Sequence, residues 1–590
     1  MKKKRLIYLT GVFCLLLCAC GQTQPGDTGR EEDGVPVENG SWNGLADAVE
    51  PGAEGSRAEG ADGAQQGGQA EGADGAQQGG QAEGADGAQQ GGQADGVENA
   101  QNGTGEQDWA ACFQNMKYTK SDKGISDTNP VMTQRFGADP YGMVYEDRVY
   151  LYMTADALER DADGQVTENT YSKIRSINVI STDDMVNFTD HGSVAAAGPE
   201  GAAKWAHNSW APAAAWKEID GKVKFFLYFA DNGGGIGVLE SDSPTGPFTD
   251  PLGEALISRK TPNCADVTWL FDPAVLVDDD GRAYLYFGGG IPEGRIADPG
   301  TARVVELGED MISIKGEPRV LDVPYLFEDS GIHKAGDKYY YTYCSNWQVD
   351  DEGTARWGFR SAEIVSMEGD SPMGPFTVKE RILENPGKYC GLYGNNHHCV
   401  FSFQDRWYIA YHTRVLEKAM GLEKGYRCTQ LEEFAMGEDG TIGTIPQTMT
   451  GREQLKYVDA YADNSGVNMA VQAGLDTVCL EDGQTMVLTG IDSGDYMKVQ
   501  GVDFGEEPAV GVEILLRKVS ESEEPCVIQV KTDALFGDIA GYVPVEQQGD
   551  AEDGFYRCRI ALEQELTGVH DVYFVFCGSG YEVKSWRFER

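Results

Sequence analysis

The stretch PAVLVDDDGRAYLYF at residues 273–287 has the pattern of a β-hairpin: a short apolar strand, a tight turn rich in Asp and Gly, and an aromatic-rich strand. The same pattern occurs at residues 142–153, 214–229, 331–343 and 399–411. Successive copies lie roughly 55–75 residues apart, which leaves room for about four strands in each unit. We therefore predict an all-β protein built around a five-bladed β-propeller. A β-sandwich is the competing architecture, but its hairpins would not need so long a period.

The five hairpins share a second feature, a position eight residues before a residue of each turn. The residues at that position are Asp139, Pro212, Asp272, Glu328 and His397. The first strand of each blade lines the central channel of a propeller, so three carboxylates and a histidine would meet at one end of the channel. Burying charges costs about several kcal/mol each, and a core has no reason to gather three acids. We expect a functional site there; the alternative is that they are turn or cap residues on separate loops.

Three acids without a basic cluster suit the cleavage of a glycosidic bond. One carboxyl group must be protonated to expel the leaving oxygen, and another must be ionised to activate water or to attack the anomeric carbon. A third negative charge nearby raises the pKa of the acid. Metal binding is the rival interpretation, although a zinc hydrolase usually needs more histidine than the seven in this chain. No GxSxG motif supports Ser–His–Asp chemistry.

The 590-residue chain carries a formal net charge of −47. This charge argues against nucleic acid as a partner, because phosphates require a basic surface. It also argues against adhesion to an anionic surface through charge. A neutral or extracellular partner fits better; the alternative is that the acidity only keeps the protein soluble.

Residues 1–20 have the pattern of an export signal. The basic sequence KKKR at residues 2–5 precedes an apolar run that ends at Leu17 and is too short to span a bilayer comfortably. The sequence LCAC that follows resembles a bacterial lipobox, which implies lipidation of Cys20. We therefore predict a lipid-anchored protein of the cell membrane that faces the extracytoplasmic side, at the cell surface or in the periplasm. Ordinary secretion is the alternative.

Residues 21–125 are predicted to form a disordered acidic linker. Three identical copies of AEGADGAQQGGQ occupy residues 58–69, 70–81 and 82–93. Such a stretch cannot bury enough apolar surface to offset the entropy of the chain. Its role would be that of a flexible spacer between the anchor and the folded region.

The folded region resembles glycoside hydrolase family 43. The matching motifs are GADP (137–140), STDDMVNFTDHG (181–192), SWAPAA (209–214), FDPAVLVDDDGRAYLYFGG (271–289), FEDSGIHKAGDKYYYTYCS (327–345), GNNHHCVF (394–401) and YHTR (411–414). They occur in the order of the family, and we assign residues 126–452 to this propeller domain. The resemblance implies an inverting enzyme; most members are α-L-arabinofuranosidases or β-xylosidases, and some are endo-arabinanases.

The resemblance also implies roles for single residues. Asp139 would be the general base that activates water, Glu328 the general acid, and Asp272 the residue that raises the pKa of the acid and orients it. His397 resembles the channel histidine that coordinates a calcium ion in many members, largely together with water. No organic cofactor is implied. The sequence departs from the family at Asp329, where Gly or Ala often follows the acid.

Three further residues are candidates for binding the sugar. Arg414 resembles the arginine that holds the sugar in the terminal subsite, and Trp210 resembles an aromatic residue that lines the pocket, with packing within the blade as its alternative. Phe271 stands beside Asp272 and is predicted to contact substrate.

The motifs GNNH, GYRCTQLEEF (425–434) and EDGTI (438–442) look most like the arabinofuranosidase branch. We predict an exo-acting enzyme, a monomer, that removes α-L-arabinofuranosyl groups from arabinoxylan or arabinan-type polysaccharide. The alternatives are a β-xylosidase of the same family, a metal-dependent hydrolase and a surface glycan-binding lipoprotein without activity.

Residues 453–590 form a second predicted domain, a β-sandwich of the jelly-roll type. Short alternating strands without helices indicate this fold, and DYMKVQGVDFG (495–505) and GVHDVYFVF (568–576) resemble a family 6 carbohydrate-binding module. Glu582 stands where that family has an Asn that contacts sugar. Phe555, Tyr556 and Tyr581 are candidates for stacking on a sugar ring, and a sandwich that only supports the propeller is the alternative. Ten cysteines follow the signal, and we expect mostly buried free thiols with one or two bridges possible.

Overall fold

The structure is a computed structural model that describes residues 108–547, 551 and 553–590. The predicted signal, Cys20 and the three repeats lie outside the described residues. Nearly all of the regular secondary structure in the described part of the chain is β-strand. Its short helical segments are η2 (Trp109–Phe113), η3 (Tyr171–Lys173), α1 (Asp351–Trp357), α2 (Pro386–Cys390) and α3 (Val415–Ala419). The prediction of an all-β protein is therefore confirmed.

Five antiparallel sheets succeed one another from Ala138 to Phe434. The first contains β1 (Ala138–Tyr145), β2 (Arg148–Thr154), β3 (Ser176–Thr182) and β4 (Phe188–Ala195), and the second β5 (Trp210–Ile219), β6 (Lys222–Ala230), β7 (Gly235–Ser241) and β8 (Ile257–Ser258). The third contains β9 (Ala274–Val277), β10 (Ala283–Phe287), β11 (Arg303–Leu307) and β12 (Ile314–Val320), and the fourth β13 (Leu326–Ala335), β14 (Lys338–Ser345), β15 (Ile364–Gly369) and β16 (Phe376–Leu383). The fifth contains β17 (His398–Phe403), β18 (Arg406–Thr413) and β19 (Cys428–Phe434).

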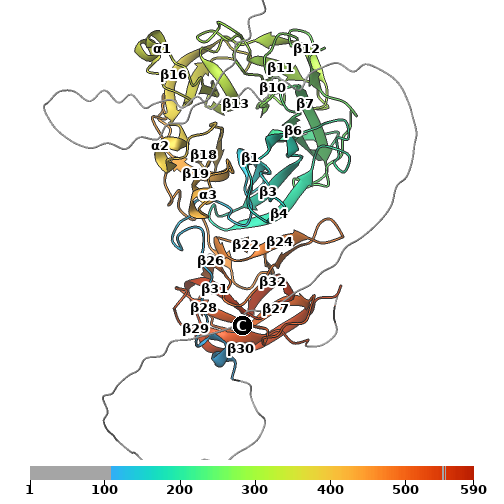
Figure 1. Cartoon of the computed structure of the whole chain (residues 1–590), viewed down its shortest axis with the longest axis vertical. Helices are drawn as coiled ribbons and strands as arrows, with labels where there is room; N and C mark the ends of the chain where they lie inside the picture. The colour runs from blue at the N-terminus through green and yellow to red at the C-terminus, as the bar shows by residue number, and fades with distance from the viewer. Residues whose placement is uncertain (1–107, 548–550, 552) are drawn as a thin grey trace, which may run out of the picture. The chain divides into compact units, whose positions relative to one another are not determined.

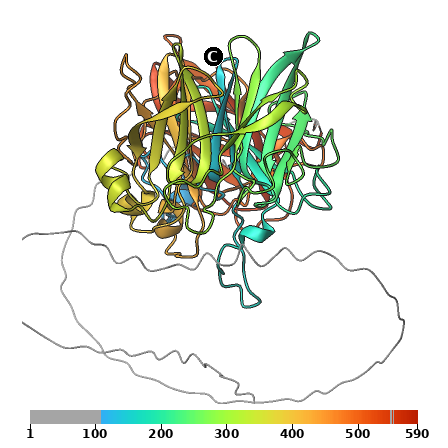
Figure 2. The ribbon, with the colours of Figure 1, turned by 90° about the horizontal axis from the view of Figure 1, so that it is seen from above.

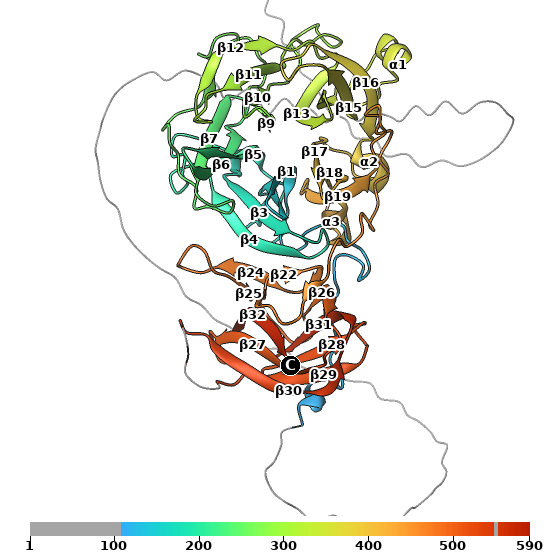
Figure 3. The ribbon, with the colours of Figure 1, turned by 180° about the vertical axis from the view of Figure 1, so that it is seen from behind.

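The first strand of each sheet contacts the first strand of the next. These contacts run from β1 to β5, β9, β13 and β17, and β17 in turn contacts β1. The sheets accordingly follow one another around a centre in Figure 1, and the view from behind shows the same order (Figure 3). The start of every inner strand therefore faces a common centre.

Tyrosines of the second strands connect neighbouring sheets. The hydroxyl of Tyr152 in β2 donates a hydrogen bond to the Pro244 carbonyl (2.6 Å), and Tyr228 in β6 donates to the Met311 carbonyl (2.7 Å). Tyr286 in β10 likewise donates to a carbonyl in the loop between β15 and β16. These rings are fully buried, and a buried hydroxyl requires such a partner. The aromatic strands of the repeated pattern thus pack one sheet against the next.

The C-terminal part is a sandwich of two sheets. One contains β20 (Val458–Asp459), β23 (Val471–Ala473), β26 (Tyr496–Asp503), β28 (Val527–Thr532), β29 (Ile539–Pro544) and β31 (Val569–Cys577). The other contains β21 (Asn464–Ser465), β24 (Asp476–Cys479), β25 (Met486–Thr489), β27 (Ala509–Lys518), β30 (Tyr556–Leu566) and β32 (Tyr581–Glu589). A core of Val, Ile, Phe and Trp side chains fills the space between them. The predicted β-sandwich is confirmed.

The sandwich and the first sheet share backbone pairing. The short strand β22 (Asn468–Met469) pairs antiparallel with β4, and the Asn187 side chain exchanges two hydrogen bonds with the backbone of Gln500 (2.8 and 2.9 Å). The described residues accordingly form one compact unit (Figure 2).

The structure differs from the sequence prediction at residues 108–125, which were assigned to the disordered linker. Trp109–Phe113 form the short helix η2, and Phe113, Met116 and Tyr118 pack against a hydrophobic cluster that includes residues of the sandwich. The Thr119 hydroxyl also donates to Asp495 Oδ1 (2.6 Å). The apolar side chains of this segment explain why it packs.

All ten described cysteines are free thiols, and seven of them are buried. The prediction of mostly buried thiols is therefore confirmed for the described residues. Within the same residues, no helix is both long enough and apolar enough to cross a bilayer.

Candidate active site

The predicted acids lie at the beginnings of inner strands. Asp139 is the second residue of β1, Asp272 lies two residues before β9, and Glu328 is the third residue of β13. His397 immediately precedes β17. All four residues are buried, with 4–6% of their surface exposed. Four different sheets thus supply one site.

His397 brings the carboxylates of two sheets together. Its Nδ1 lies 3.8 Å from Asp139 Oδ1 and 3.8 Å from Asp272 Oδ2. Asp272 Oδ2 also accepts a hydrogen bond from the backbone N–H of Asp329 (2.8 Å), the residue after Glu328. The predicted acids are therefore gathered at one place and do not lie on separate surfaces.

Asp139 is surrounded by groups that favour its ionised form. Burial by itself would raise the pKa of Asp139, but the Arg427 guanidinium, a hydrogen bond with His412 and the nearby His397 outweigh burial and hold this pKa well below its usual range. Arg427 Nη1 donates to Asp139 Oδ1 at 2.9 Å, and His412 Nδ1 lies 3.0 Å from the same oxygen. Asp139 is therefore a carboxylate throughout the ordinary pH range.

Glu328 has the opposite environment. Burial raises its pKa well above the usual range, and the neighbouring Asp272, Asp329 and Asp139 raise it further. The pKa of Asp272 is also raised, first by burial and then by Asp139. Glu328 Oε1 is buried and has no hydrogen-bond partner among the described residues. The site thus favours the ionised form of one carboxyl group and the protonated form of another, which is the requirement for acid–base chemistry.

Arg427 is a site residue that sequence reasoning did not assign. It lies just before β19, and its Nε and Nη2 donate to the two oxygens of Asp156 (both 2.9 Å), while Nη1 reaches Asp139. The guanidinium also lies over the ring of Tyr171, 4.7 Å from its centre. The only signal in the sequence is an Arg inside the motif GYRCTQLEEF, which does not reveal its partners.

The three predicted sugar-binding residues have different positions. Trp210 begins β5 and is partly buried, and its Nε1 donates to the Tyr171 carbonyl (2.9 Å), so it stands next to the residue that packs on Arg427. Phe271 is buried and packs edge-on against Trp269. Arg414 binds Glu417 and the Tyr393 carbonyl, and no ion pair joins it to the acids of the site.

The side chains around His397 do not by themselves fit a calcium ion. Calcium takes about six to eight oxygen ligands, and no group of three or more His, Cys, Asp or Glu in the described residues is arranged to hold a metal ion. His397 Nε2 faces Asp329 Oδ1 at 3.2 Å, and its Nδ1 faces two further carboxylates. An ion at His397 would need water for most of its ligands, and no step of the mechanism proposed here depends on one.

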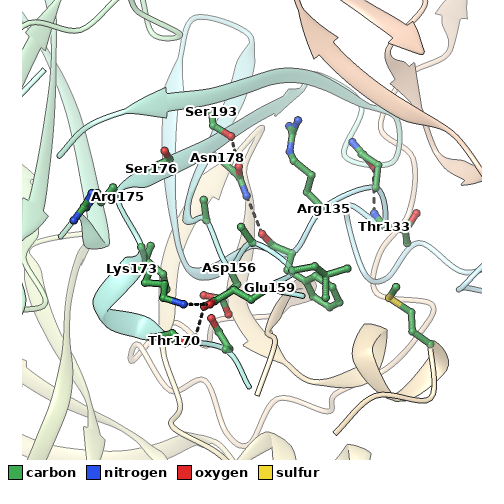
Figure 4. A pocket seen from close by; sticks show the side chains of 18 residues that line it. Thr133, Arg135, Asp156, Glu159, Thr170, Lys173, Arg175, Ser176, Asn178 and Ser193 are labelled. Atoms are coloured by element: carbon green, nitrogen blue, oxygen red, sulfur yellow. Dashed lines mark hydrogen bonds and ion pairs between the residues drawn. The ribbon is translucent and has the colours of Figure 1, made fainter. Parts of the chain in front are cut away.

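A pocket of about 470 Å³ lies behind Asp156. Its wall includes Phe136, Glu159, Lys173 and Asn178, and Figure 4 shows Glu159 paired with Lys173 at one side and Asn178 bonded to Ser193 at another. Asp156 lines this pocket and also binds Arg427, the residue that donates to Asp139. The pocket and the carboxyl group of Asp139 are therefore connected through Asp156 and Arg427.

Comparison with known proteins identifies the family. Residues 127–442 match the family described as glycosyl hydrolases family 43. The chain belongs to glycosyl hydrolase family 43. It is therefore a glycoside hydrolase, and the resemblance seen in the motifs is confirmed. Residues 461–590 match carbohydrate binding module family 6.

Individual relatives cover most of the chain. A protein of Paenibacillus polymyxa named arabinoxylan arabinofuranohydrolase is 44% identical over 78% of this chain and 74% of its own length. A protein of the same name from Bacillus subtilis is 40% identical over 79% of this chain and 93% of its own length. A crystal structure of a family 43 arabinoxylan arabinofuranohydrolase from Bacillus subtilis, in complex with cellotetraose, is similar with a TM-score of 0.75 and 38% identity, and covers 80% of this chain and 99% of that one.

Proposed function

We propose that this glycoside hydrolase removes α-L-arabinofuranosyl groups from arabinoxylan, as an exo-acting, inverting enzyme. The observation that carries the proposal is the pair of oppositely tuned carboxyl groups, Asp139 ionised beside Arg427 and Glu328 protonated among other acids. The names of the two relatives at 44% and 40% identity support arabinoxylan as the substrate.

The proposed mechanism follows from the two carboxyl groups. Asp139 takes a proton from a water molecule as the water oxygen attacks the anomeric carbon. Glu328 gives its proton to the glycosidic oxygen as the bond from that oxygen to the anomeric carbon breaks. The sugar leaves with inverted configuration. At that point Asp139 has gained one proton and Glu328 has lost one. Asp272 raises the pKa of Glu328 and, through the N–H of Asp329, is tied to the chain next to the acid.

The five sheets are proposed to be the blades of a five-bladed propeller, which explains why the acids converge. The contacts between successive inner strands, including that of β17 with β1, support this architecture. The site would then lie at the end of the channel where the inner strands begin.

Replacement of either catalytic group tests the assignment. We expect Asp139→Asn and Glu328→Gln to lower the release of arabinose from arabinoxylan by at least about 100-fold, because each removes one of the two proton transfers. Wild-type-like release by either variant would refute its role. Proton NMR of the first anomer released checks the inversion, and nitrophenyl arabinofuranoside against nitrophenyl xyloside distinguishes the proposed activity from that of a β-xylosidase.

Removal of metal ions tests the predicted calcium ion at His397. We propose that a calcium ion held there, mainly through water, would affect stability and not the chemical step, because Asp139 and Glu328 provide both proton transfers. Protein treated with EDTA is expected to keep its kcat, with any effect appearing in the melting temperature. Loss of kcat that is restored by added calcium would favour a metal-dependent hydrolase instead.

The sequence also supports proposals on where the enzyme works. We propose that it acts outside the cytoplasm as a monomer anchored to the cell membrane through a lipid on Cys20. The basic residues 2–5, the apolar run after them and the lipobox-like sequence ending in Cys20 support the anchor.

A further inference from the structure

Asp329 occupies the position in its hairpin that Asp139 occupies in the first hairpin. The residue pairs that close the two hairpins are Tyr145–Arg148 and Ala335–Lys338. Asp139 and Asp329 each lie six residues before the first member of the closing pair. The equivalent of Glu328 in β1 is Ala138, and both these residues precede a shift in register of the same length.

The backbone shows the same equivalence. Asp139, Asp272 and Asp329 have φ angles of 48°, 49° and 69°, in the left-handed region that few residues other than glycine adopt. Aspartate tolerates this region better than most residue types. The fourth sheet thus places an aspartate where the first sheet places the proposed base and the third sheet places Asp272, and it places the proposed acid one residue earlier.

The backbone of Asp329 holds one member of the proposed catalytic set. Its N–H donates to Asp272 Oδ2 at 2.8 Å. A hydrogen bond from a backbone N–H to a buried carboxyl oxygen fixes the orientation of that group. Asp272 is thereby held by the residue that is covalently joined to Glu328.

The side chain of Asp329 holds two histidines. Its Oδ2 accepts a hydrogen bond from the backbone N–H of His398 (3.2 Å) and contacts His398 Nδ1, while its Oδ1 lies 3.2 Å from His397 Nε2. In its ionised form this carboxyl group only accepts hydrogen bonds, so it then favours the ring form of His398 in which Nδ1 carries the proton. The Thr342 hydroxyl bonds His398 Nε2 on the other side (2.8 Å).

We propose that Asp329 is a positioning residue of the active site, which fixes the ring of His397 and the carboxyl group of Asp272 relative to the proposed base Asp139. The inference rests on the proposed function of Asp139 and Glu328. Asp329 is completely buried, and burying a carboxylate costs about several kcal/mol unless its partners compensate. Here the compensating partners are the parts of the site themselves. Asp329 touches no reacting atom in this account and acts only through its neighbours.

Asp329→Asn tests the proposal with little change in volume. In asparagine one of the two oxygens becomes an NH2 group that cannot accept a hydrogen bond, so the variant loses either the acceptor for His398 or the negative charge that faces His397, whereas its backbone N–H to Asp272 is retained. We expect kcat on arabinoxylan to fall about 10–100-fold, as is typical when a supporting partner of a site is lost, with KM within twofold of wild type. The control is Asp337→Asn, an exposed position in the turn of the same hairpin, which should match wild type. A kcat of Asp329→Asn within twofold of wild type would overturn the proposal.

A second variant keeps the test decisive if Asn at 329 lowers the yield of folded protein. Thr342→Val removes only the distant partner of His398, and we expect a smaller fall in kcat, again at constant KM and melting temperature; an unchanged kcat would count against the proposal. Glu328→Gln, measured in parallel, separates the two levels of the argument. If Glu328→Gln is inactive and Asp329→Asn is fully active, only the positioning role fails. If Glu328→Gln is fully active, the proposed function itself fails.

Discussion

At the scale of residues, two carboxyl groups of the same chemistry differ because their neighbours differ. Asp139 contacts Arg427 and His412, whereas the charged groups that most affect Glu328 are other acids. Although both groups are buried, the pKa of Asp139 is lowered and the pKa of Glu328 is raised. Arg427, which Asp156 holds in place, has the largest share among the groups that lower the pKa of Asp139.

Asp272→Asn tests how far neighbouring charge sets the pKa of the acid. Burial is the main cause of the raised pKa of Glu328 and Asp272 is the next, so the variant is expected to lower that pKa while burial keeps it raised. Because the acid must be protonated, activity is lost as the pH rises through this pKa. The alkaline limb of the kcat/KM profile should therefore move to lower pH.

Asparagine at 272 still offers an oxygen to the N–H of Asp329, which limits the structural change. The acid limb reports Asp139 and should stay at low pH, because Arg427 is unchanged. A pH profile with its alkaline limb unmoved would show that burial alone sets the pKa of Glu328. Asp337→Asn again serves as the control, since it changes an exposed aspartate in the turn between β13 and β14, the strand pair that carries Glu328.

At the scale of elements, the repeated hairpin was a sufficient signal for the position of each inner strand. Counting eight residues back from a turn residue found Asp139, Asp272 and His397, which the structure places in contact. The count made Glu328 the equivalent of Asp139, whereas the strand register makes Asp329 the equivalent of Asp139. The count started from Gly336, which is the first of the two turn residues, although the equivalent starting point is the second. The repeat of the hairpin pattern does not show which turn residue to count from.

Arg427 could not be predicted for a different reason. Its two carboxylate partners, Asp139 and Asp156, lie 288 and 271 residues away in the sequence. Such contacts arise only when the last of the five sheets meets the first, so no local pattern records them. Arg414, by contrast, bonds to Glu417 within one helical turn, and motif position alone suggested a role in binding sugar.

The segment before β1 contains a buried lysine whose effect on stability depends on pH. Lys123 donates to the Pro130 carbonyl (2.8 Å), and burial, aided by Arg452, lowers its pKa to about 7 from an ordinary value of 10.5. Between these two values the unfolded chain binds one proton more than the folded chain. The free energy of unfolding therefore rises with pH in this window, by at most about 1.4 kcal/mol per pH unit from this residue.

Lys123→Met removes this dependence. We expect the variant to be more stable than wild type at pH 6, and the difference to stay level up to about pH 7 and then shrink steadily up to pH 9.5, as measured by denaturant unfolding. Lys120→Met changes an exposed lysine of the same segment and should show no such trend. A difference between Lys123→Met and wild type that stays constant with pH would contradict a lowered pKa.

At the scale of the whole molecule, the sandwich is joined to the first sheet by backbone pairing and by buried charge. Asp190 in β4 is buried, binds Arg135 and accepts a hydrogen bond from the Thr477 hydroxyl of the sandwich (2.6 Å). This contact crosses the domain boundary predicted at residue 452. The family 6 match is therefore compatible with the alternative of a sandwich that supports the propeller.

The loop-end residues proposed to stack on sugar are not accessible. Phe555 is 2% exposed, lies under Arg517 and Lys584, and neighbours the ion pair of Arg517 with Glu582 (2.7 Å). Tyr556 and Tyr581 are also buried. Sugar rings stack on exposed aromatic faces, so these three side chains stabilise the sandwich and leave no face for a sugar ring.

Phe555→Leu is accordingly expected to leave binding to arabinoxylan unchanged. The measurement is retention in a gel that contains arabinoxylan, made in the Glu328→Gln background so that the polysaccharide is not consumed. Phe536→Ala, which removes an aromatic ring that is 81% exposed, is the matched comparison within the same domain. Weaker retention by Phe555→Leu at an unchanged melting temperature would mean that Arg517 and Lys584 move away to admit a sugar. Equal retention of Phe555→Leu and the parent would instead place any contact between the sandwich and polysaccharide on another surface, because Arg517 and Lys584 cover the ring of Phe555 and the rings of Tyr556 and Tyr581 are buried.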